Sequence, residues 1–223
     1  MQKNNSEKAT GRKEKAAKRL LEIKAVFFRP DDPFIWASGI KSPVYCDNRL
    51  ILSEAAVRGE IEAMLAELIS ENFPDVSLIM GTSTAGIPHA ALAADILGLP
   101  MGYVRAGAKS HGRKNLIEGK LEKGQKTVVV EDLISTGGSA LDVADILRLE
   151  GADVLGVASI FTYGMDIAGK RFADAGLKAV SLTDFDEVTK TAARLGYIKS
   201  EDVERLLRFR DNPLDQSWAE GRA

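Results

Sequence analysis

Thiol and imidazole side chains are scarce in this sequence of 223 residues, which has one cysteine, Cys46, and two histidines, His89 and His111. A single thiol excludes an intrachain disulfide, and a chain without disulfides suits the reducing cytoplasm. One cysteine and two histidines are also too few to build a zinc site from these residue types. We therefore expect a cytoplasmic protein with no disulfide framework and no metal site of its own.

The sequence also has no large excess of positive or negative charge and no long apolar run. The 30 basic and 32 acidic residues give a net charge of -2, so the bulk of the protein is not a nucleic-acid binder by charge. No run reaches the roughly 18 apolar residues of a membrane span, and the basic first 19 residues lack the apolar core of a signal peptide. This basic start is either an arm that touches RNA or a membrane, or a solvated lead into the first helix. We favour the second interpretation.

Apolar residues make up 45% of the chain, which is enough for a sizeable core. From Val76 to Leu182, short apolar runs typical of strands alternate with helical patterns, which predicts an α/β fold with a doubly wound, mainly parallel sheet. Strands are expected at residues 76–80, 102–104, 127–130, 154–161 and 178–182. Helices are expected at residues 13–27, 54–71, 87–97, 168–175, 184–194 and 201–210. One more is expected after the strand at residues 127–130, ended by Gly151.

The chain is expected to be a single domain over residues 1–223. Residues 1–50 do not fit the alternation and are predicted to form a helix and a small hood over the carboxyl edge of the sheet. Residues 51–210 would form the α/β core, and residues 211–223 a polar tail that is ordered only in part.

The most informative segment runs from Thr127 to Ser139 and joins an apolar strand, two acids, a turn rich in hydroxyls and glycine, and the start of a helix. Open α/β sheets bind ligands where such a strand ends, and the free N–H groups of the following helix attract phosphate. Carboxylates repel phosphate but accept hydrogen bonds from vicinal hydroxyls. We therefore expect Glu131 and Asp132 to hold a ribose diol and residues 135–139 to cradle a 5′-phosphate, with Ser139 also placed to cap the helix.

A second segment, residues 105–114, carries four Lys or Arg side chains and His111 among glycines, with no acid until Glu118. A mobile cationic loop of this kind suits a diphosphate leaving group, because it can bind the diphosphate, exclude water and stabilise the charge that develops as the bond breaks. The alternative is a solvated surface loop with a chance run of charge. The neighbouring 127–139 segment favours the first interpretation.

The 127–139 segment resembles the phosphoribosyl diphosphate (PRPP) binding motif of the type I phosphoribosyltransferases. Three further segments resemble the orotate phosphoribosyltransferases in particular. Residues 34–47, with Ser38-Gly39-x-x-Ser42-Pro43, resemble their amino-terminal hood, residues 81–88 their diphosphate-contacting turn, and residues 103–119 their catalytic lid. The resemblance covers about residues 25–200 and keeps the order of the motifs.

The resemblance implies the type I phosphoribosyltransferase fold and transfer of the 5-phosphoribosyl group from PRPP to orotate, giving orotidine 5′-monophosphate and pyrophosphate in pyrimidine biosynthesis. It also implies Mg2+ bound mainly through PRPP, and a homodimer whose lid reaches the neighbouring subunit's site, with no nucleic-acid or membrane partner. Arg105, Lys109 and His111 would be the catalytic residues at the diphosphate, and Ser135 would contact orotate. The PRPP-binding residues would be these three lid residues with Glu131, Asp132, Leu133, Ile134, Ser135, Thr136, Gly137, Gly138 and Ser139.

The sequence departs from some members of that family at Ala37, Ala85 and Ala106, where they carry lysine. The residue that holds the orotate carboxylate is therefore unassigned, with Lys41 as one candidate. Two other functions remain open: a phosphoribosyltransferase for a purine or another base, against which the hood argues, and a PRPP-sensing regulator that binds nucleic acid. A regulator would not need the complete cationic lid.

Overall fold

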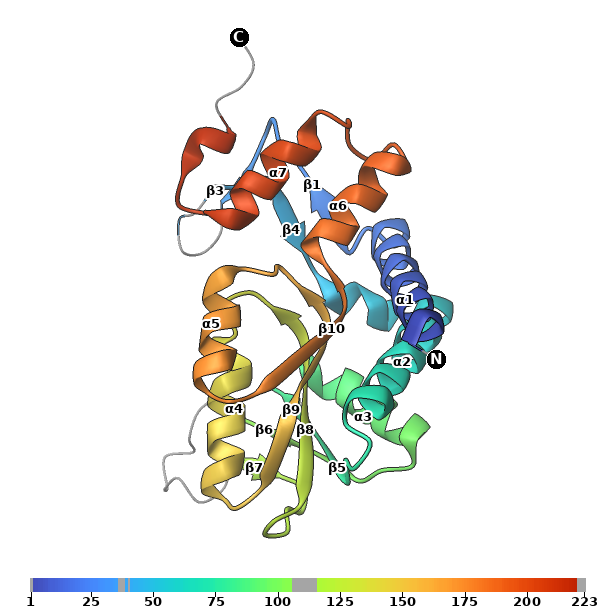
Figure 1. Cartoon of the computed structure of the whole chain (residues 1–223), viewed down its shortest axis with the longest axis vertical. Helices are drawn as coiled ribbons and strands as arrows, with labels where there is room; N and C mark the ends of the chain where they lie inside the picture. Colours follow the sequence, from blue (N-terminus) through green and yellow to red (C-terminus); the bar gives the residue numbers. More distant parts are fainter. Residues whose placement is uncertain (1, 36–38, 40, 106–115, 220–223) are drawn as a thin grey trace.

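The computed structural model describes residues 2–35, 39, 41–105 and 116–219. A six-stranded sheet lies at its centre, with the strands in the order β10-β9-β8-β5-β6-β7 (Figure 1). Every neighbouring pair is parallel except β6 and β7. The strands are β5 (Leu78–Thr82), β6 (Met101–Val104), β7 (Ile117–Glu118), β8 (Lys126–Ile134), β9 (Asp153–Thr162) and β10 (Lys178–Asp184).

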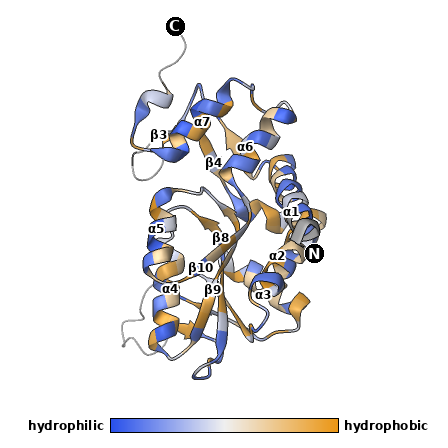
Figure 2. Ribbon diagram, viewed as in Figure 1, coloured by the Kyte–Doolittle hydropathy of each residue, from blue (hydrophilic) through white to orange (hydrophobic). Residues whose placement is uncertain are grey.

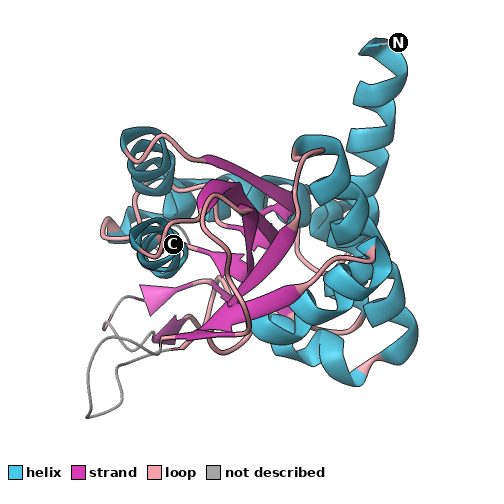
Figure 3. Cartoon of the chain, turned by 90° about the horizontal axis from the view of Figure 1, so that it is seen from below, coloured by secondary structure: helices cyan, strands magenta, loops and turns pink. Residues whose placement is uncertain are grey.

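Helices cover both faces of this sheet (Figures 1 and 3). One face packs against α1, α2 and α3, and the other against α4 and α5. These helices are α1 (Gln2–Glu22), α2 (Ala55–Asn72), α3 (Gly86–Leu97), α4 (Gly138–Leu149) and α5 (Asp166–Asp174). The predicted α/β fold with a doubly wound, mainly parallel sheet is confirmed.

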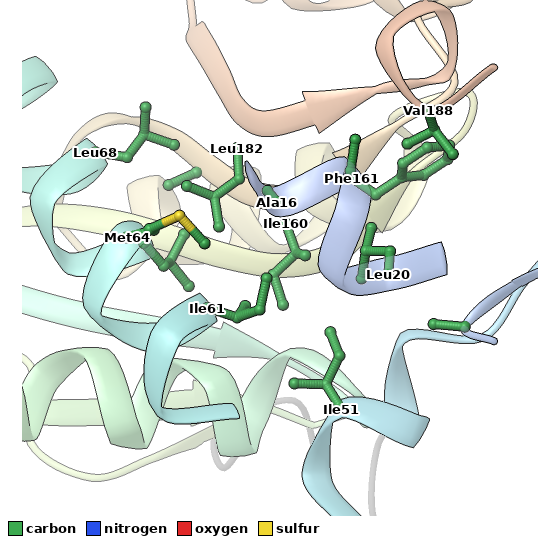
Figure 4. Close-up of a cluster of buried hydrophobic side chains, with 14 of the residues drawn as sticks. Ala16, Leu20, Ile51, Ile61, Met64, Leu68, Ile160, Phe161, Leu182 and Val188 are labelled. Carbon is green, nitrogen blue, oxygen red and sulfur yellow. The ribbon is translucent and has the colours of Figure 1, made fainter. Parts of the chain in front are cut away.

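The two faces of the sheet carry separate apolar cores because alternate strand residues point in opposite directions. Val128 and Val130 belong to the core under α1, α2 and α3, whereas Val129 belongs to the core under α4 and α5. This is why β8 is apolar at three consecutive positions, Val128 to Val130. Figure 2 shows hydrophobic residues in orange on the strands of the sheet. Figure 4 shows the first core, in which Ile61 of α2 lies near Ile160 of β9.

The first helix differs from its prediction at both ends. It begins at Gln2 rather than near residue 13, and it ends at Glu22, two residues before Lys24 takes a left-handed φ of 57°. Phe27, the last residue of the predicted helix, lies in a strand instead and is 37% exposed.

The basic start is part of α1 itself rather than a lead into it, so that prediction was wrong in extent. Its cations from Lys8 onward form ion pairs, although Lys8, Lys15 and Lys18 stay more than half exposed to solvent. The guanidinium of Arg12 lies 2.7 Å from a Glu71 oxygen of α2, and Arg19 donates to both carboxylate oxygens of Glu60, also on α2, at 2.8 and 3.2 Å. These acids pair with the cations of the first helix and so support its early turns. They could not be identified as partners from the sequence, because they lie about 40 to 60 residues further along the chain.

The hood is built from both ends of the described chain. Its early part comprises β1 (Val26–Phe28) paired with β4 (Val44–Cys46), β2 (Phe34–Ile35) paired with β3 (Lys41–Ser42), and the 3-10 helix η1 (Asn48–Ser53). Its late part comprises α6 (Phe185–Arg194), α7 (Asp202–Asp211) and the 3-10 helix η3 (Gln216–Trp218), which lie beside those strands in Figure 1.

A single buried arginine joins the two parts of the hood. Arg205 of α7 donates to the carbonyl oxygens of Pro30 and Trp218 at 2.9 and 3.1 Å, and to the carboxylate of Asp31 at 3.1 Å. Trp218 is 1% exposed and packs edge-on against Phe209. The polar tail predicted from residue 211 onward therefore includes a firmly packed turn. None of the helices in the described part of the chain is long and apolar enough to cross a lipid bilayer.

Candidate active site

A cavity of about 350 Å3 opens where the hood meets the carboxyl ends of β5 and β8. It is lined by Cys46, Asp47, Arg49, Ser83, Thr84, Ala85, Glu131, Asp132, Leu133 and Ser139. A larger, mainly apolar cavity of about 800 Å3 lies between α5 and β10, but neither Glu131 nor Asp132 lines it. The smaller cavity is the candidate site, because it holds the acid pair at the strand ends where open α/β sheets bind ligands.

The strand that carries the acids is longer than predicted. It was expected at residues 127–130, but β8 continues to Ile134, so Glu131 and Asp132 lie within the strand rather than in the turn. Consecutive strand residues point to opposite faces. Glu131 is accordingly buried, at 6% exposure, while Asp132 is half-buried.

Glu131 is held by three donors. The Thr82 hydroxyl donates to its Oε1 at 2.6 Å, the backbone N–H of Asp132 donates to the same oxygen at 3.1 Å, and the Ser139 hydroxyl donates to Oε2 at 2.8 Å. Burial, with a smaller contribution from the neighbouring Asp132 carboxyl, raises the pKa of Glu131 to about 7, against the lowering effect of the two hydroxyls. Near neutral pH, this carboxyl can therefore exist with or without its proton.

Ser139 does not cap helix α4, contrary to the expectation from its position. The cap residue is Gly137, with a left-handed φ of 78°, and the Ser139 hydroxyl bonds to Glu131 instead. Gly137 also has no room for a side chain, because a Cβ there would lie 2.9 Å from the ring of Phe172. Glycine at this position thus serves both the backbone conformation and the close approach of α5.

Helix α5 also fixes the peptide that precedes Gly137. The guanidinium of Arg171 donates to the carbonyl oxygen of Thr136 at 3.2 Å. In a trans peptide the carbonyl and the N–H point in opposite directions, so the N–H of Gly137 points away from Arg171.

The turn after β5 forms another wall of the cavity. Its Ser83–Thr84 peptide is cis, and the Ser83 hydroxyl donates to the carbonyl oxygen of Val104 at the end of β6. Gly86 opens α3 in close contact with the motif, since a Cβ on it would lie 2.5 Å from the Val130 carbonyl oxygen. The turn is thus packed tightly between β6 and β8.

Three hood residues that sequence reasoning did not assign also reach this site. Asn48, 1% exposed, donates through its side chain to the carbonyl oxygen of Asp132 at 2.7 Å. Asp47 caps η1 and accepts two hydrogen bonds from the Arg49 guanidinium, which hold the pKa of Asp47 below its usual value. The signal in the sequence is an acid and an arginine two residues apart, Asp47 and Arg49, where the hood segment ends.

Cys46 also lines the cavity, but it has no sign of being a nucleophile. Burial, then the charges of Asp132 and Asp47, raise the pKa of its thiol well above the usual value. The thiol donates a weak hydrogen bond to the side-chain oxygen of Asn48, 3.3 Å away.

The other predicted residues are distributed as follows. Of the motif, Glu131, Asp132, Leu133 and Ser139 line the candidate site, Ile134 lines the larger cavity, and residues 135–138 lead into α4. Arg105 follows β6, half-buried and 3.4 Å from a Glu118 oxygen, and does not line the cavity as described. Lys109 and His111 lie outside the described residues.

Comparison with known proteins decides which family has this arrangement. The model of the phosphoribosyl transferase domain family matches residues 51–191. The orotate phosphoribosyltransferase of Bacillus subtilis strain 168 is 54% identical to this chain over 202 residues, which is 91% of the chain and 94% of that protein.

The chain belongs to the orotate phosphoribosyltransferase family.

Solved structures agree with this assignment. The crystal structure of orotate phosphoribosyltransferase from Aeropyrum pernix superposes with a TM-score of 0.71 at 31% identity, covering 82% of this chain and 98% of that one. A crystal structure of the Mycobacterium tuberculosis orotate phosphoribosyltransferase in complex with 5-phospho-α-D-ribosyl 1-diphosphate has a TM-score of 0.53 at 27% identity, covering 65% of this chain and 82% of that one. The phosphoribosyltransferase fold and the resemblance seen in the sequence are confirmed.

Proposed function

We propose that this protein transfers the 5-phosphoribosyl group of PRPP to orotate, giving orotidine 5′-monophosphate and pyrophosphate for pyrimidine biosynthesis in the cytoplasm. The main support is the 54% sequence identity to an orotate phosphoribosyltransferase over 91% of the chain. The second support is a cavity lined by an acid pair, next to a glycine-rich turn at the start of a helix. In the reaction the N1 nitrogen of orotate forms a bond to C1 of the sugar, and the proton of N1 passes to solvent or to the departing pyrophosphate. The bond from C1 to the diphosphate oxygen breaks, and pyrophosphate leaves with the electron pair.

In this proposal the acid pair holds the ribose. Asp132 is half-buried in the cavity wall, and its oxygens would accept hydrogen bonds from the ribose hydroxyls. Glu131 would do so by exchanging its bonds to Thr82 and Ser139, since a hydroxyl of the sugar can replace a hydroxyl of the protein. The turn from Ser135 to Ser139, with Leu133 and Ile134 supporting it in β8, would bind the 5′-phosphate, and Ser135 would also contact orotate.

The diphosphate is assigned to the cationic segment. Arg105, Lys109 and His111 would bind the leaving group, stabilise its developing charge and keep water from the sugar cation as the bond breaks. The lining of the described cavity has an excess of acids, with Asp47, Glu131 and Asp132 against Arg49 alone. A highly charged anion therefore needs positive charge from outside this lining, which the lid would supply.

The cavity also suits a magnesium ion carried by the substrate. Mg2+ prefers oxygen ligands and keeps several waters, so one or two carboxylates and the substrate's phosphates are enough to hold it. Asp132 is the carboxylate that fits this role, because Asp47 is bonded to Arg49 and Glu131 to three donors. When bound, the ion would neutralise part of the diphosphate charge.

We also propose a homodimer in which each lid reaches the site of the other subunit.

The test is spectroscopic measurement of orotate consumption with and without PRPP and magnesium. We expect consumption only when all components are present, and no turnover with adenine, hypoxanthine, xanthine or uracil. Replacing orotate by one of these bases with full activity would mean that the base is wrongly assigned. Tight, salt-dependent binding of nucleic acid without PRPP turnover would instead support the regulator.

A lysine pair tests the role of the lid. Lys109→Ala should lower kcat sharply, about 100-fold, because a charged hydrogen bond to the leaving group is lost in the transition state. Lys120→Ala is the matched control, since Lys120 is an exposed lysine that pairs, as far as the described residues go, with Glu122 alone. Equal rates for the two variants would remove Lys109 from the reaction.

A further inference from the structure

The candidate site has one positive side chain that no part of the mechanism above uses. Among the described residues that line the cavity, Arg49 is the sole cation, and the pKa of its guanidinium is raised chiefly by Asp47 and, to a smaller extent, by the charge of Asp132 in the same lining. The wall next to it is the turn Ser83-Thr84-Ala85, in which the small side chain of Ala85 supplies no charge. Arg49 is therefore the positive group that the described lining offers to an anionic part of a substrate.

The guanidinium of Arg49 is held in one orientation but keeps free donors. Its Nε donates to Oδ1 of Asp47 at 2.7 Å, and one Nη2 hydrogen donates to Oδ2 at 2.8 Å. An arginine has five N–H donors, and within the described residues the other three make no hydrogen bond to protein. The side chain is 64% exposed, so these donors are open to a ligand.

The backbone beneath Arg49 is fixed relative to the acid pair. Asn48, the preceding residue, is buried and bonds to the carbonyl oxygen of Asp132 on β8. Asp47, on the other side of Asn48, accepts from the backbone N–H of Arg49 at 3.2 Å while it holds the guanidinium. Thus Arg49 cannot move away from the sugar-binding strand without breaking two side-chain contacts. Such support of a binding group by its neighbours limits the entropy that binding must cost.

We propose that Arg49 is a substrate-binding residue that donates a pair of hydrogen bonds to the diphosphate of PRPP, with Asp47 as the residue that positions its guanidinium. This inference rests on the proposed function. The planar fork of arginine matches two oxygens of a phosphate group, and the diphosphate is the most highly charged group that the site must hold. The carboxylate of orotate has the same anionic oxygens, so the experiment must separate the two.

The experiment compares Arg49→Gln and Arg49→Lys with Arg29→Gln. Arg29 is the matched control because it is also an exposed hood arginine near a carboxylate, Asp32, but does not line the cavity. Two quantities are measured for each protein: the KM values for PRPP and for orotate, and the dissociation constant of magnesium pyrophosphate by calorimetry. A thermal unfolding curve for each variant checks that it is folded.

We expect Arg49→Gln to raise the KM for PRPP and the dissociation constant of pyrophosphate about 10- to 100-fold, with the KM for orotate little changed. Arg49→Lys keeps the charge but loses the fork, so it should lie between Arg49→Gln and the wild type. Asp47→Asn should weaken pyrophosphate binding by a smaller factor, since the donors remain but are no longer aligned.

Other outcomes would overturn the assignment. A rise in the KM for orotate alone would move the contact to the orotate carboxylate. Unchanged constants, or an equal loss in Arg29→Gln, would reduce Arg49 to general surface charge. If the wild type itself failed to consume orotate, the proposed function would fall, whereas pyrophosphate binding would still report on Arg49 directly.

Discussion

Two buried glutamates, Glu62 and Glu131, show how one residue type serves two purposes in this fold. Glu62 is 2% exposed and lies between α2 and α3, where its Oε1 is 2.5 Å from Nδ1 of the fully buried His89. Glu131 is 6% exposed and opens onto the candidate site. Burial raises the pKa of both carboxyls, and hydrogen bonds to their neighbours oppose the rise.

The difference lies in the partners. Glu62 has one buried, ionisable partner, and its Oε2, like Nε2 of His89, has no hydrogen-bond partner among the described residues. Glu131 has both oxygens occupied, by groups that are neutral and lie beside a cavity. A sealed pair of this kind can hold two helices together but cannot exchange partners. A carboxylate held by hydroxyls can exchange them for the hydroxyls of a substrate.

The largest expected effect breaks the sealed pair. Glu62→Leu should lower the free energy of unfolding by about 3 to 5 kcal/mol, because it leaves His89 buried without its partner. The kcat should stay within a factor of about two. Denaturant unfolding and steady-state kinetics measure the two quantities.

The double variant Glu62→Leu with His89→Leu sharpens this test. Replacing both partners by apolar groups should recover most of the lost stability. If the double variant were less stable than Glu62→Leu, the pair would not be coupled in the way the geometry indicates.

Removing the charge of Glu131, which lies beside the cavity, should lower the reaction rate without lowering the stability of the fold. Glu131→Gln should lower kcat/KM for PRPP by about 100-fold, because the amide replaces an oxygen acceptor by a donor where the ribose hydroxyls bind. The unfolding midpoint at neutral pH should not fall. Asp132→Asn should act similarly. Asp75→Asn is the control, because Asp75 is exposed and precedes β5, at the end of that strand away from the candidate site. A variant with a near-normal rate would show that the site is misplaced.

The pH dependence of stability tests the raised pKa of Glu131. The folded state binds this proton more tightly than the unfolded chain, so the stabilisation is present below the ordinary pKa near 4.5 and is lost as the pH rises through about 7. Between pH 5 and pH 8 the wild type should therefore lose about 2 kcal/mol of unfolding free energy relative to Glu131→Gln. Glu62 titrates in both proteins and cancels in the difference. A relative gain by the wild type would mean that the pKa is depressed instead.

The smallest effect concerns the hydroxyl that steadies Glu131. The acid limb of the rate profile should lie near pH 7, and Thr82→Val should move it upward by less than about one pH unit, because a bond that lowers the pKa of Glu131 is removed. Thr189→Val is the matched control, since its buried hydroxyl in α6 has no hydrogen-bond partner in the described chain. A shift of equal size in the control would point to a general change in packing.

Much of the core could be predicted from sequence because its signals are local. The apolar runs of β8 and β9 and the helical pattern of α2 each lie within one segment, and their positions differ from prediction by only a few residues. The errors occurred where distant partners decide the structure. The basic start forms helix from Gln2 because its cations meet the acids of α2, and no local pattern announces that.

The candidate site was also predictable where its signals are local, and not where distant contacts form it. Residues 131–139 could be found because strand, acids and turn are contiguous. Asn48 and Arg49 could not, because their importance depends on a contact across 84 residues of chain to the Asp132 carbonyl. The bond from Ser139 to Glu131, in place of a helix cap, depends on the depth at which β8 buries that glutamate, which composition does not give.

The way Arg205 fastens the hood has a consequence for biosynthesis. Its contacts join residues 30 and 31, made early, to the carbonyl of Trp218, made near the end. A nascent chain from which Trp218 has not yet emerged can fold its central sheet, but it lacks the Arg205 bond that joins the two parts of the hood. A translation product stalled before Trp218 emerges should therefore resist proteolysis in its core while its hood is still open to cleavage.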